Sequence, residues 1–98
     1  MDYTYLDIAK MIDHSLLRPF YSDEELDAGC QLALDYDVAT VCIKPYGLKR
    51  AAALLKGSNV KPTTTIGFPH GGHTTAIKVA EAQQALADKE LATQQTAL

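Results

Sequence analysis

The stretch VATVCIKP, from Val38 to Pro45, decides the fold expected for this chain. Up to Ile43 it is a short, almost unbroken apolar run rich in β-branched residues, which is typical of a parallel strand covered on both faces. Two further runs, IDHSLLRP at Ile12 to Pro19 and TIGFPHGG at Thr65 to Gly72, also end on polar or glycine-rich residues. We therefore predict three parallel strands, with the candidate chemistry on the strands and at their ends.

The segments between these runs have helical signals. Ser22 and Glu25 have the spacing of a capping box, and apolar residues then recur with helical period. Strands that alternate with helices in this way predict an α/β fold with right-handed crossovers. The predicted elements are a lead-in helix over residues 6–12, a strand over 11–17, a helix over 23–36, a strand over 38–43, a helix over 45–57, a strand over 60–66, a loop over 67–75 and a helix over 76–88.

Composition excludes several classes of protein. The net charge is −3 and the pI is about 5.4, so the chain lacks the positive potential that attracts nucleic acid, and we do not expect nucleic acid as a partner. The sequence has no long apolar run and no basic segment before an apolar core at its start, so we predict neither a membrane span nor a signal peptide. Cys30 and Cys42 show no CxxC spacing. We therefore expect a cytoplasmic protein with reduced cysteines.

Three polar residues lie in or beside the first strand. Asp13 is an acid in an apolar strand, where a carboxylate needs hydrogen bonds or a chemical role. It is either a strand-end residue bonded to nearby backbone amides or a functional acid. His14 alternates to the other face, where we expect it to pack against the first helix. Ser15 returns to the face of Asp13 and supplies a hydroxyl.

The second strand and the glycine-rich loop supply the remaining candidates. Cys42 is interpreted as a buried structural cysteine. Lys44 is the one lysine at a strand end, the place where an imine would form, but we interpret it as a solvated rim residue. The loop after the third strand has a weak anion-binding pattern. Its His70 and His73 lack a third ligand, so we predict no metal site.

Together these motifs resemble the first three strands of deoxyribose-phosphate aldolase, a class I aldolase family. The similarity runs from about Asp7 to Asp88 and includes DIAKMIDHSLLRP, VATVCIKP and VKPTTTIGFPHGG. It implies a partial (β/α)8 TIM barrel of about three βα units with a lead-in helix. An eight-unit barrel takes roughly 250 residues, so three units take about 94. We expect one truncated barrel segment over residues 1–98, aldolase-like over 1–87 and divergent over 88–98. Residues 88–98 are polar and alanine-rich, so we expect them to continue the last helix or to form a frayed tail, not a fourth strand.

The resemblance also implies a reaction. The family is a lyase that makes or cleaves 2-deoxyribose 5-phosphate through a lysine imine (Schiff base), without a cofactor. It implies that Asp13 and Ser15 support a polar network, so we favour the functional role of Asp13. It also implies that Cys42 and Lys44 line the substrate pocket. The family carries its imine lysine on a later strand, so we expect this chain alone to be inactive and to meet a sugar phosphate or aldehyde only in a completed barrel.

An alternative class is a self-associating structural or interaction module that retains the barrel segment for its fold. Three strands leave two open edges, and we expect inward-facing apolar residues to be exposed as well. A homo-oligomer, most simply a dimer, would cover both. The expected inward-facing set is Ile12, Val41, Ile43 and Ile66.

Overall fold

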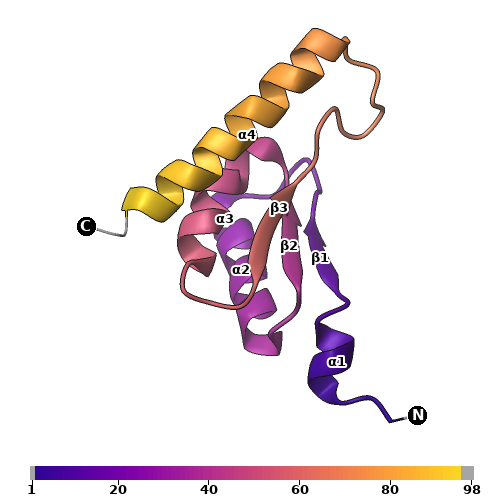
Figure 1. Cartoon of the computed structure of the whole chain (residues 1–98), viewed down its shortest axis with the longest axis vertical. Helices are drawn as coiled ribbons and strands as arrows, with labels where there is room; N and C mark the ends of the chain where they lie inside the picture. The colour runs from indigo at the N-terminus through magenta and orange to yellow at the C-terminus, as the bar shows by residue number, and fades with distance from the viewer. Residues whose placement is uncertain (1, 96–98) are drawn as a thin grey trace.

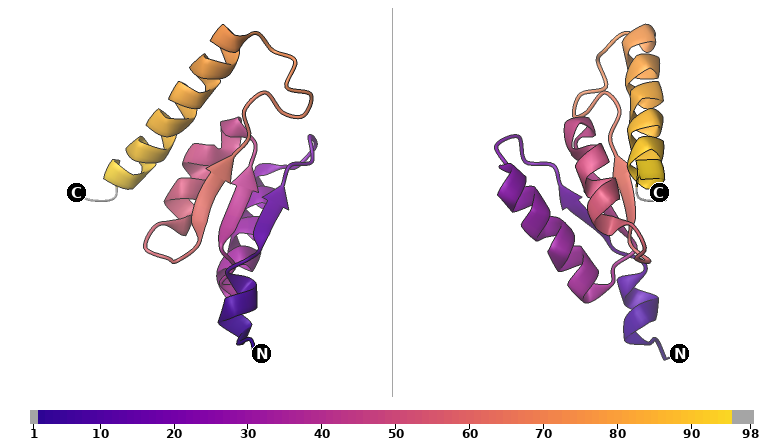
Figure 2. Two further views of the ribbon diagram at one scale, coloured as in Figure 1. Left: turned by 45° about the vertical axis from the view of Figure 1, so that its right-hand side comes forward. Right: turned by 90° about the vertical axis from the view of Figure 1, so that its left-hand side faces the viewer.

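The computed structural model describes residues 2–95, with only the backbone described for residues 92–95. Three strands form one parallel sheet in the order β1, β2, β3, with α2 and α3 against one face and α4 beside α3 (Figures 1 and 2). This arrangement confirms the predicted α/β fold. In chain order the elements are α1 (Tyr5–Ala9), β1 (Asp13–Leu16), α2 (Asp23–Tyr36), β2 (Thr40–Ile43), the 3₁₀ helix η1 (Pro45–Gly47), α3 (Leu48–Leu55), β3 (Lys61–Thr64) and α4 (Thr75–Gln95).

Helix α2 forms as its sequence predicts. The Ser22 hydroxyl accepts a hydrogen bond from the Glu25 amide, and the Glu25 carboxylate accepts one from the Ser22 amide, so the capping box is complete. The helix ends at Asp37, which adopts a left-handed conformation with φ of 51°. Its buried residues, Leu26, Gly29, Cys30 and Ala33, face the sheet and α3.

The sheet has two different faces because side chains alternate along each strand. Asp13 pairs with Thr40 and Thr40 with Lys61; two residues along, Ser15 pairs with Cys42 and Cys42 with Thr63. These six residues share one face, which we call the open face. The opposite face carries Leu16, Val41 and Ile43 into the hydrophobic core beneath α2 and α3.

The expectation that Val41 and Ile43 point toward a barrel interior is wrong. Val41 is 0% exposed and Ile43 is 1% exposed, and both pack with residues of α2 and α3. Ile12 and Ile66, the other two members of that set, are 44% and 38% exposed. An apolar run shows that a strand is buried but does not show which residues face the helices.

Several elements have bounds that differ from the prediction. Strands β2 and β3 are shorter than expected, and the expected helix over 45–57 is divided into η1 and α3, which ends at Leu55. Strand β1 begins only at Asp13, because Met11 and Ile12 belong to the turn that follows α1. Their backbone amides donate hydrogen bonds to the carbonyls of Ile8 and Ala9. Helix α4 runs from Thr75 to Gln95, so the described residues after Asp88 continue the helix, which is one of the two expectations for this segment. The rest of the expected tail, 96–98, lies outside the described residues. Within residues 2–95, no helix is both long and apolar enough to cross a membrane.

Lys10 ties three chain segments together at the amino ends of the strands. Its ammonium donates hydrogen bonds to Asp37 Oδ1 at 2.8 Å, to the Val38 carbonyl at 3.0 Å and to the Asn59 carbonyl at 3.3 Å. Asp37 and Val38 lead into β2, and Asn59 leads into β3. Lys10 therefore joins the end of α1 to the two loops that start the neighbouring strands.

We predict that Lys10→Met lowers the free energy of unfolding by about 1–2 kcal/mol, because the partly buried acceptors lose a shared donor while the aliphatic stem is kept. Urea denaturation of the 98-residue chain measures the change. Lys49→Met is the matched control: Lys49 is exposed, and its ammonium has no partner among residues 2–95. Its effect should be within about 0.5 kcal/mol. Equal losses in the two variants would contradict the role given to Lys10.

Candidate functional site

The open face brings three of the four candidate site residues onto adjacent strands. Asp13 and Ser15 project from β1, and Cys42 projects from β2 directly beside Ser15. Helices α2 and α3 pack on the other face, so their bulk does not cover these side chains. The face is polar, since Thr40, Lys61 and Thr63 complete it.

Asp13 lies at the first residue of β1, at the amino end of the sheet. Its carboxylate is exposed, and its Oδ1 accepts a hydrogen bond from the Thr40 hydroxyl. The backbone amide partners considered for this acid are not observed among the described residues. Thr40 was not among the candidates from the sequence, because its proximity to Asp13 depends on the register between β1 and β2.

Ser15 and Cys42 lie side by side on the open face, two residues further along their strands than Asp13 and Thr40. Ser15 is exposed, and its hydroxyl makes no hydrogen bond to another residue in the described range 2–95. Cys42 is a free thiol with only 9% of its surface exposed. The second cysteine, Cys30, is buried in the core at 1% exposure, and burial, with a smaller contribution from Asp27, raises the pKa of its thiol. Of the two thiols, only Cys42 lies on the open face.

Lys44 directly follows β2 at the carboxyl end of the sheet. Its ammonium lies 5.2 Å from the centre of the exposed Tyr46 ring, a cation–π contact. With a rise of about 3.3 Å per residue, Lys44 lies about 13 Å along the strand from the level of Thr40 and Asp13. Lys44 and Asp13 are thus at opposite ends of the sheet and do not form one contact network.

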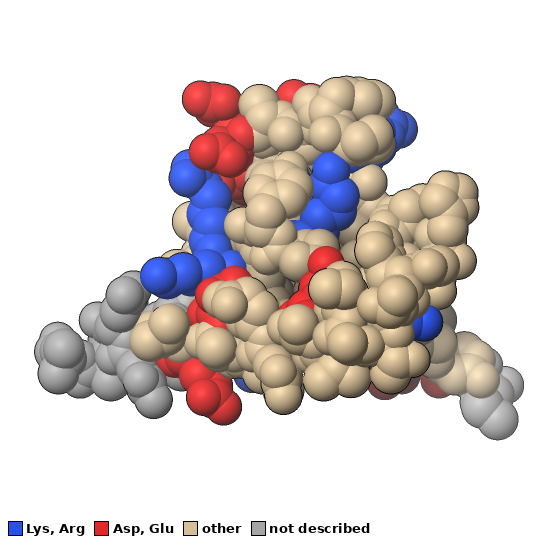
Figure 3. All heavy atoms as spheres, turned by 90° about the horizontal axis from the view of Figure 1, so that it is seen from above, with Lys and Arg blue, Asp and Glu red and all other residues tan. Residues whose placement is uncertain are grey.

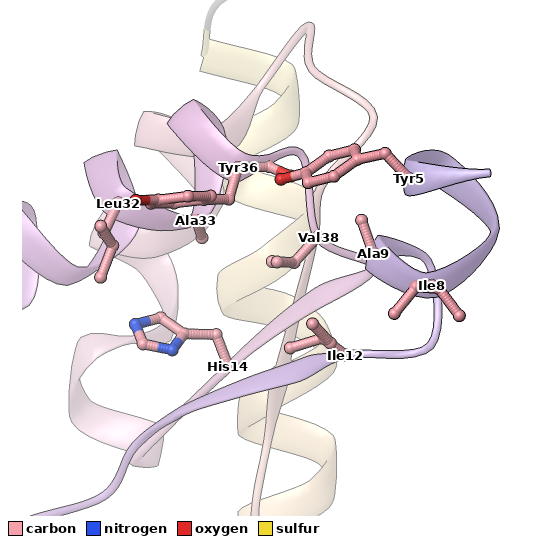
Figure 4. Close-up of a pocket in the computed structure, with 9 residues that line it drawn as sticks. All are labelled: Tyr5, Ile8, Ala9, Ile12, His14, Leu32, Ala33, Tyr36 and Val38. Carbon is pink, nitrogen blue, oxygen red and sulfur yellow. The ribbon is translucent and has the colours of Figure 1, made fainter. Parts of the chain in front are cut away.

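His14 projects from the helix face of β1, as its alternation predicts. It borders a mostly apolar hollow of about 250 Å³ between α1, β1 and α2 (Figure 4). The buried His14 Nε2 has no hydrogen-bond partner among the described residues. The hollow is lined by Tyr5, Ile8, Ala9, Ile12, His14, Leu32, Ala33, Tyr36 and Val38.

The glycine-rich loop is largely occupied by its own hydrogen bonds. The Gly67 amide donates to Glu81 Oε1 at 2.7 Å, and the Gly71 amide donates to the Gly67 carbonyl at 2.6 Å. Lys78 donates to the Gly71 carbonyl at 3.1 Å. Two of the amides expected to face an anion are therefore already used.

Neither a metal nor a nucleic-acid site is evident in the described part of the chain. Within residues 2–95, no cluster of three or more His, Cys, Asp or Glu side chains is placed to hold a metal ion. On the face seen in Figure 3, acidic and basic side chains are dispersed among uncharged ones. This distribution agrees with the weak negative net charge and gives no basic stripe on that face for a phosphate backbone.

Comparisons with known proteins identify the fold and its relatives. The chain is 64% identical over 87 residues to deoxyribose-phosphate aldolase from Rhodopirellula baltica, which is 89% of this chain and 36% of that protein. It is 46% identical over 83 residues to the enzyme of the same name from Brevibacillus brevis, which is 85% of this chain and 38% of that protein. A search against profiles of protein families finds no match.

Solved structures give the same result. A Coccidioides immitis structure assigned as a deoxyribose-phosphate aldolase superposes with a TM-score of 0.83 at 36% identity, over 88% of this chain and 34% of that one. The tetrameric deoxyribose phosphate aldolase from Aeropyrum pernix gives 0.80 at 29% identity, over 87% of this chain and 36% of that one. The chain spans about a third of the length of these relatives. In sequence and in fold, it matches the N-terminal part of deoxyribose-phosphate aldolase.

Proposed function

We propose that this chain provides the first three βα units of a deoxyribose-phosphate aldolase barrel. The completed barrel would be a lyase that makes or cleaves 2-deoxyribose 5-phosphate from acetaldehyde and glyceraldehyde 3-phosphate. The observation that carries the proposal is the open face. Asp13 and Ser15 project from β1 and Cys42 lies beside Ser15 on β2, within a segment 64% identical to an aldolase of that name. The reaction needs no cofactor and no metal.

Each candidate residue has a separate part in this proposal. Asp13 and Ser15 belong to the supporting polar network, since one supplies a proton acceptor and the other a hydroxyl on the same face of β1. Cys42 forms part of the wall of the substrate pocket beside Ser15. Lys44 contributes a charged rim at the carboxyl ends of the strands, where active sites of (β/α)8 barrels lie.

The imine lysine would come from the part of the relatives that this chain does not span. An imine requires a deprotonated amine, which proteins obtain by desolvation or by a neighbouring cation. Lys44 is only partly buried, and its ammonium contacts the exposed Tyr46 ring. That setting leaves the amine accessible to water and does not provide a desolvated pocket. We therefore propose that the 98-residue chain has no aldolase activity, and that it resides in the cytoplasm with Cys30 and Cys42 reduced.

Grafting tests the proposed function directly. Residues 7–88 of this chain should replace the corresponding segment of the Rhodopirellula baltica aldolase with retention of retro-aldol cleavage of 2-deoxyribose 5-phosphate. In that graft, Asp13→Asn should lower kcat on the order of 10²-fold, since a positioned acid–base group contributes about that much. A folded graft without activity, or an Asp13→Asn graft with full activity, would refute the proposal.

The ungrafted 98-residue chain is the control for this experiment. It should show no cleavage, and no mass increase after treatment with acetaldehyde and borohydride. A stoichiometric increase on Lys44 would instead show that this lysine forms the imine and that its assignment to the rim is wrong.

A second candidate function is self-association, and the hollow around His14 favours it. Its rim is apolar and about half exposed, with Tyr5, Ile8 and Tyr36 at 62%, 47% and 57% exposure, and it lies beside the unpaired edge of β1. Contiguous exposed apolar surface next to a free strand edge favours association. The tetrameric Aeropyrum pernix relative supports a homo-oligomer in general, and a dimer is the simplest form.

Light scattering over a dilution series measures this association. We predict a dimer at micromolar concentration that Ile8→Glu converts to a folded monomer, because the charge would be buried in the interface. Val79→Glu is the control, since Val79 is similarly exposed on α4 and lies outside the hollow. A parent chain that is monomeric at every concentration would rule out self-association. If only Val79→Glu dissociates the dimer, the interface lies on α4 and not at the hollow.

A further inference from the structure

Among residues 2–95, the hydrogen bond between Thr40 and Asp13 is the one side-chain hydrogen bond that joins β1 to β2 across the open face. We propose that Thr40 is a positioning residue, which holds the Asp13 carboxylate in one orientation and leaves its second oxygen free to accept a proton. This inference rests on the proposed function for its catalytic consequence, but the positioning itself is a property of the chain alone.

The hydroxyl of Thr40 differs from the other bonded threonine hydroxyls of the sheet. Thr63 donates to the Val41 carbonyl at 3.1 Å, and Thr64 donates to the Ile43 carbonyl at 2.6 Å, so both satisfy backbone acceptors. Thr40 instead donates to a carboxylate. A β-branched residue in a strand has a restricted χ1, so this donor is itself held in place.

Asp13 needs such a partner because its surroundings do not fix it. Its side chain is exposed at the first residue of β1, and solvent leaves an exposed aspartate several rotamers. Ordering a side chain costs entropy, and a hydrogen bond to a charged group is strong enough to offset that cost. A group held in advance in its productive geometry reacts faster than one that must be ordered during the reaction.

The Asp13 carboxylate takes its hydrogen bond from a neutral hydroxyl and forms no ion pair among the described residues. Lys61 shares the open face with Asp13, but the two residues are on the outer strands of the sheet. Thr40 on β2 is paired with both of them and separates them. The hydroxyl binds Oδ1, and Oδ2 has no hydrogen-bond partner among the described residues. Asp13 is thereby fixed while one oxygen stays available.

The first test uses the 98-residue chain and reads the Asp13 rotamer by NMR, from the three-bond couplings between its Hα and two Hβ protons. The parent and Thr40→Ser, which keeps the hydroxyl, should show the couplings of a single staggered rotamer. Thr40→Val, which keeps the shape and removes the donor, should show averaged values. Thr64→Val is the control, since it removes a sheet hydroxyl that does not contact Asp13, and it should leave the couplings unchanged.

The second test places the same substitutions in the graft on the Rhodopirellula baltica aldolase. Thr40→Val should lower kcat about tenfold, the rate equivalent of one lost hydrogen bond to a charged group, with KM changed by less than about twofold. Thr40→Ser should stay within about twofold of the parent. Thermal unfolding of each variant separates this effect from a loss of stability.

The outcomes distinguish this inference from the proposed function. If Asp13 keeps a single rotamer in Thr40→Val, or if the variant graft keeps full kcat while Asp13→Asn is impaired, Thr40 is not a positioning residue and the proposed function still stands. If Asp13→Asn has full activity, the proposed role of Asp13 is wrong, whatever its rotamer does. Loss of activity in Thr40→Ser equal to that in Thr40→Val would also overturn the inference, since the hydroxyl would not be what matters.

Discussion

The alternation of side chains along β2 is the constraint on which the rest of this structure depends. Val41 and Ile43 pack into the core with residues of α2 and α3, and this burial fixes which way the strand faces. A strand has a period of two, so Thr40 and Cys42 must lie on the other side. The parallel register then places Asp13 beside Thr40 and Ser15 beside Cys42. The polar open face follows from apolar packing beneath it.

This division explains how a stable layer can carry chemistry on one side. The residues that hold the sheet to its helices are almost fully buried, and the candidate site residues take little part in that packing. Substituting a site residue should therefore change function more than stability. The amino ends of the strands are secured separately by Lys10, which joins α1 to the loops before β2 and β3.

Local signals allowed the sequence to predict the elements well. The capping box at Ser22 and Glu25 located α2 with its observed bounds, and the β-branched run located β2. Helix α4 continues past Asp88, one of the two expectations for this segment, because its alanine-rich sequence carries no stop signal there.

Properties that depend on register or on packing between elements could not be predicted in the same way. Val41 and Ile43 were assigned to the wrong face, since a short apolar run does not distinguish its two sides. The contact between Thr40 and Asp13 joins residues 27 positions apart. The hollow around His14 depends on the angle at which α1 leaves the sheet, which no local motif encodes.

The most direct measurement of the central claim compares Val41→Thr with Cys42→Ser in urea denaturation of the 98-residue chain. Each change places one hydroxyl on β2 at nearly constant volume. If β2 has one face in the core and one polar face, Val41→Thr should lower the free energy of unfolding by about 1–3 kcal/mol, because the hydroxyl enters the apolar core. Cys42→Ser should cost less than about 1 kcal/mol, because its hydroxyl lies on the polar open face. Equal costs, or a larger cost for Cys42→Ser, would contradict the assignment of the two faces.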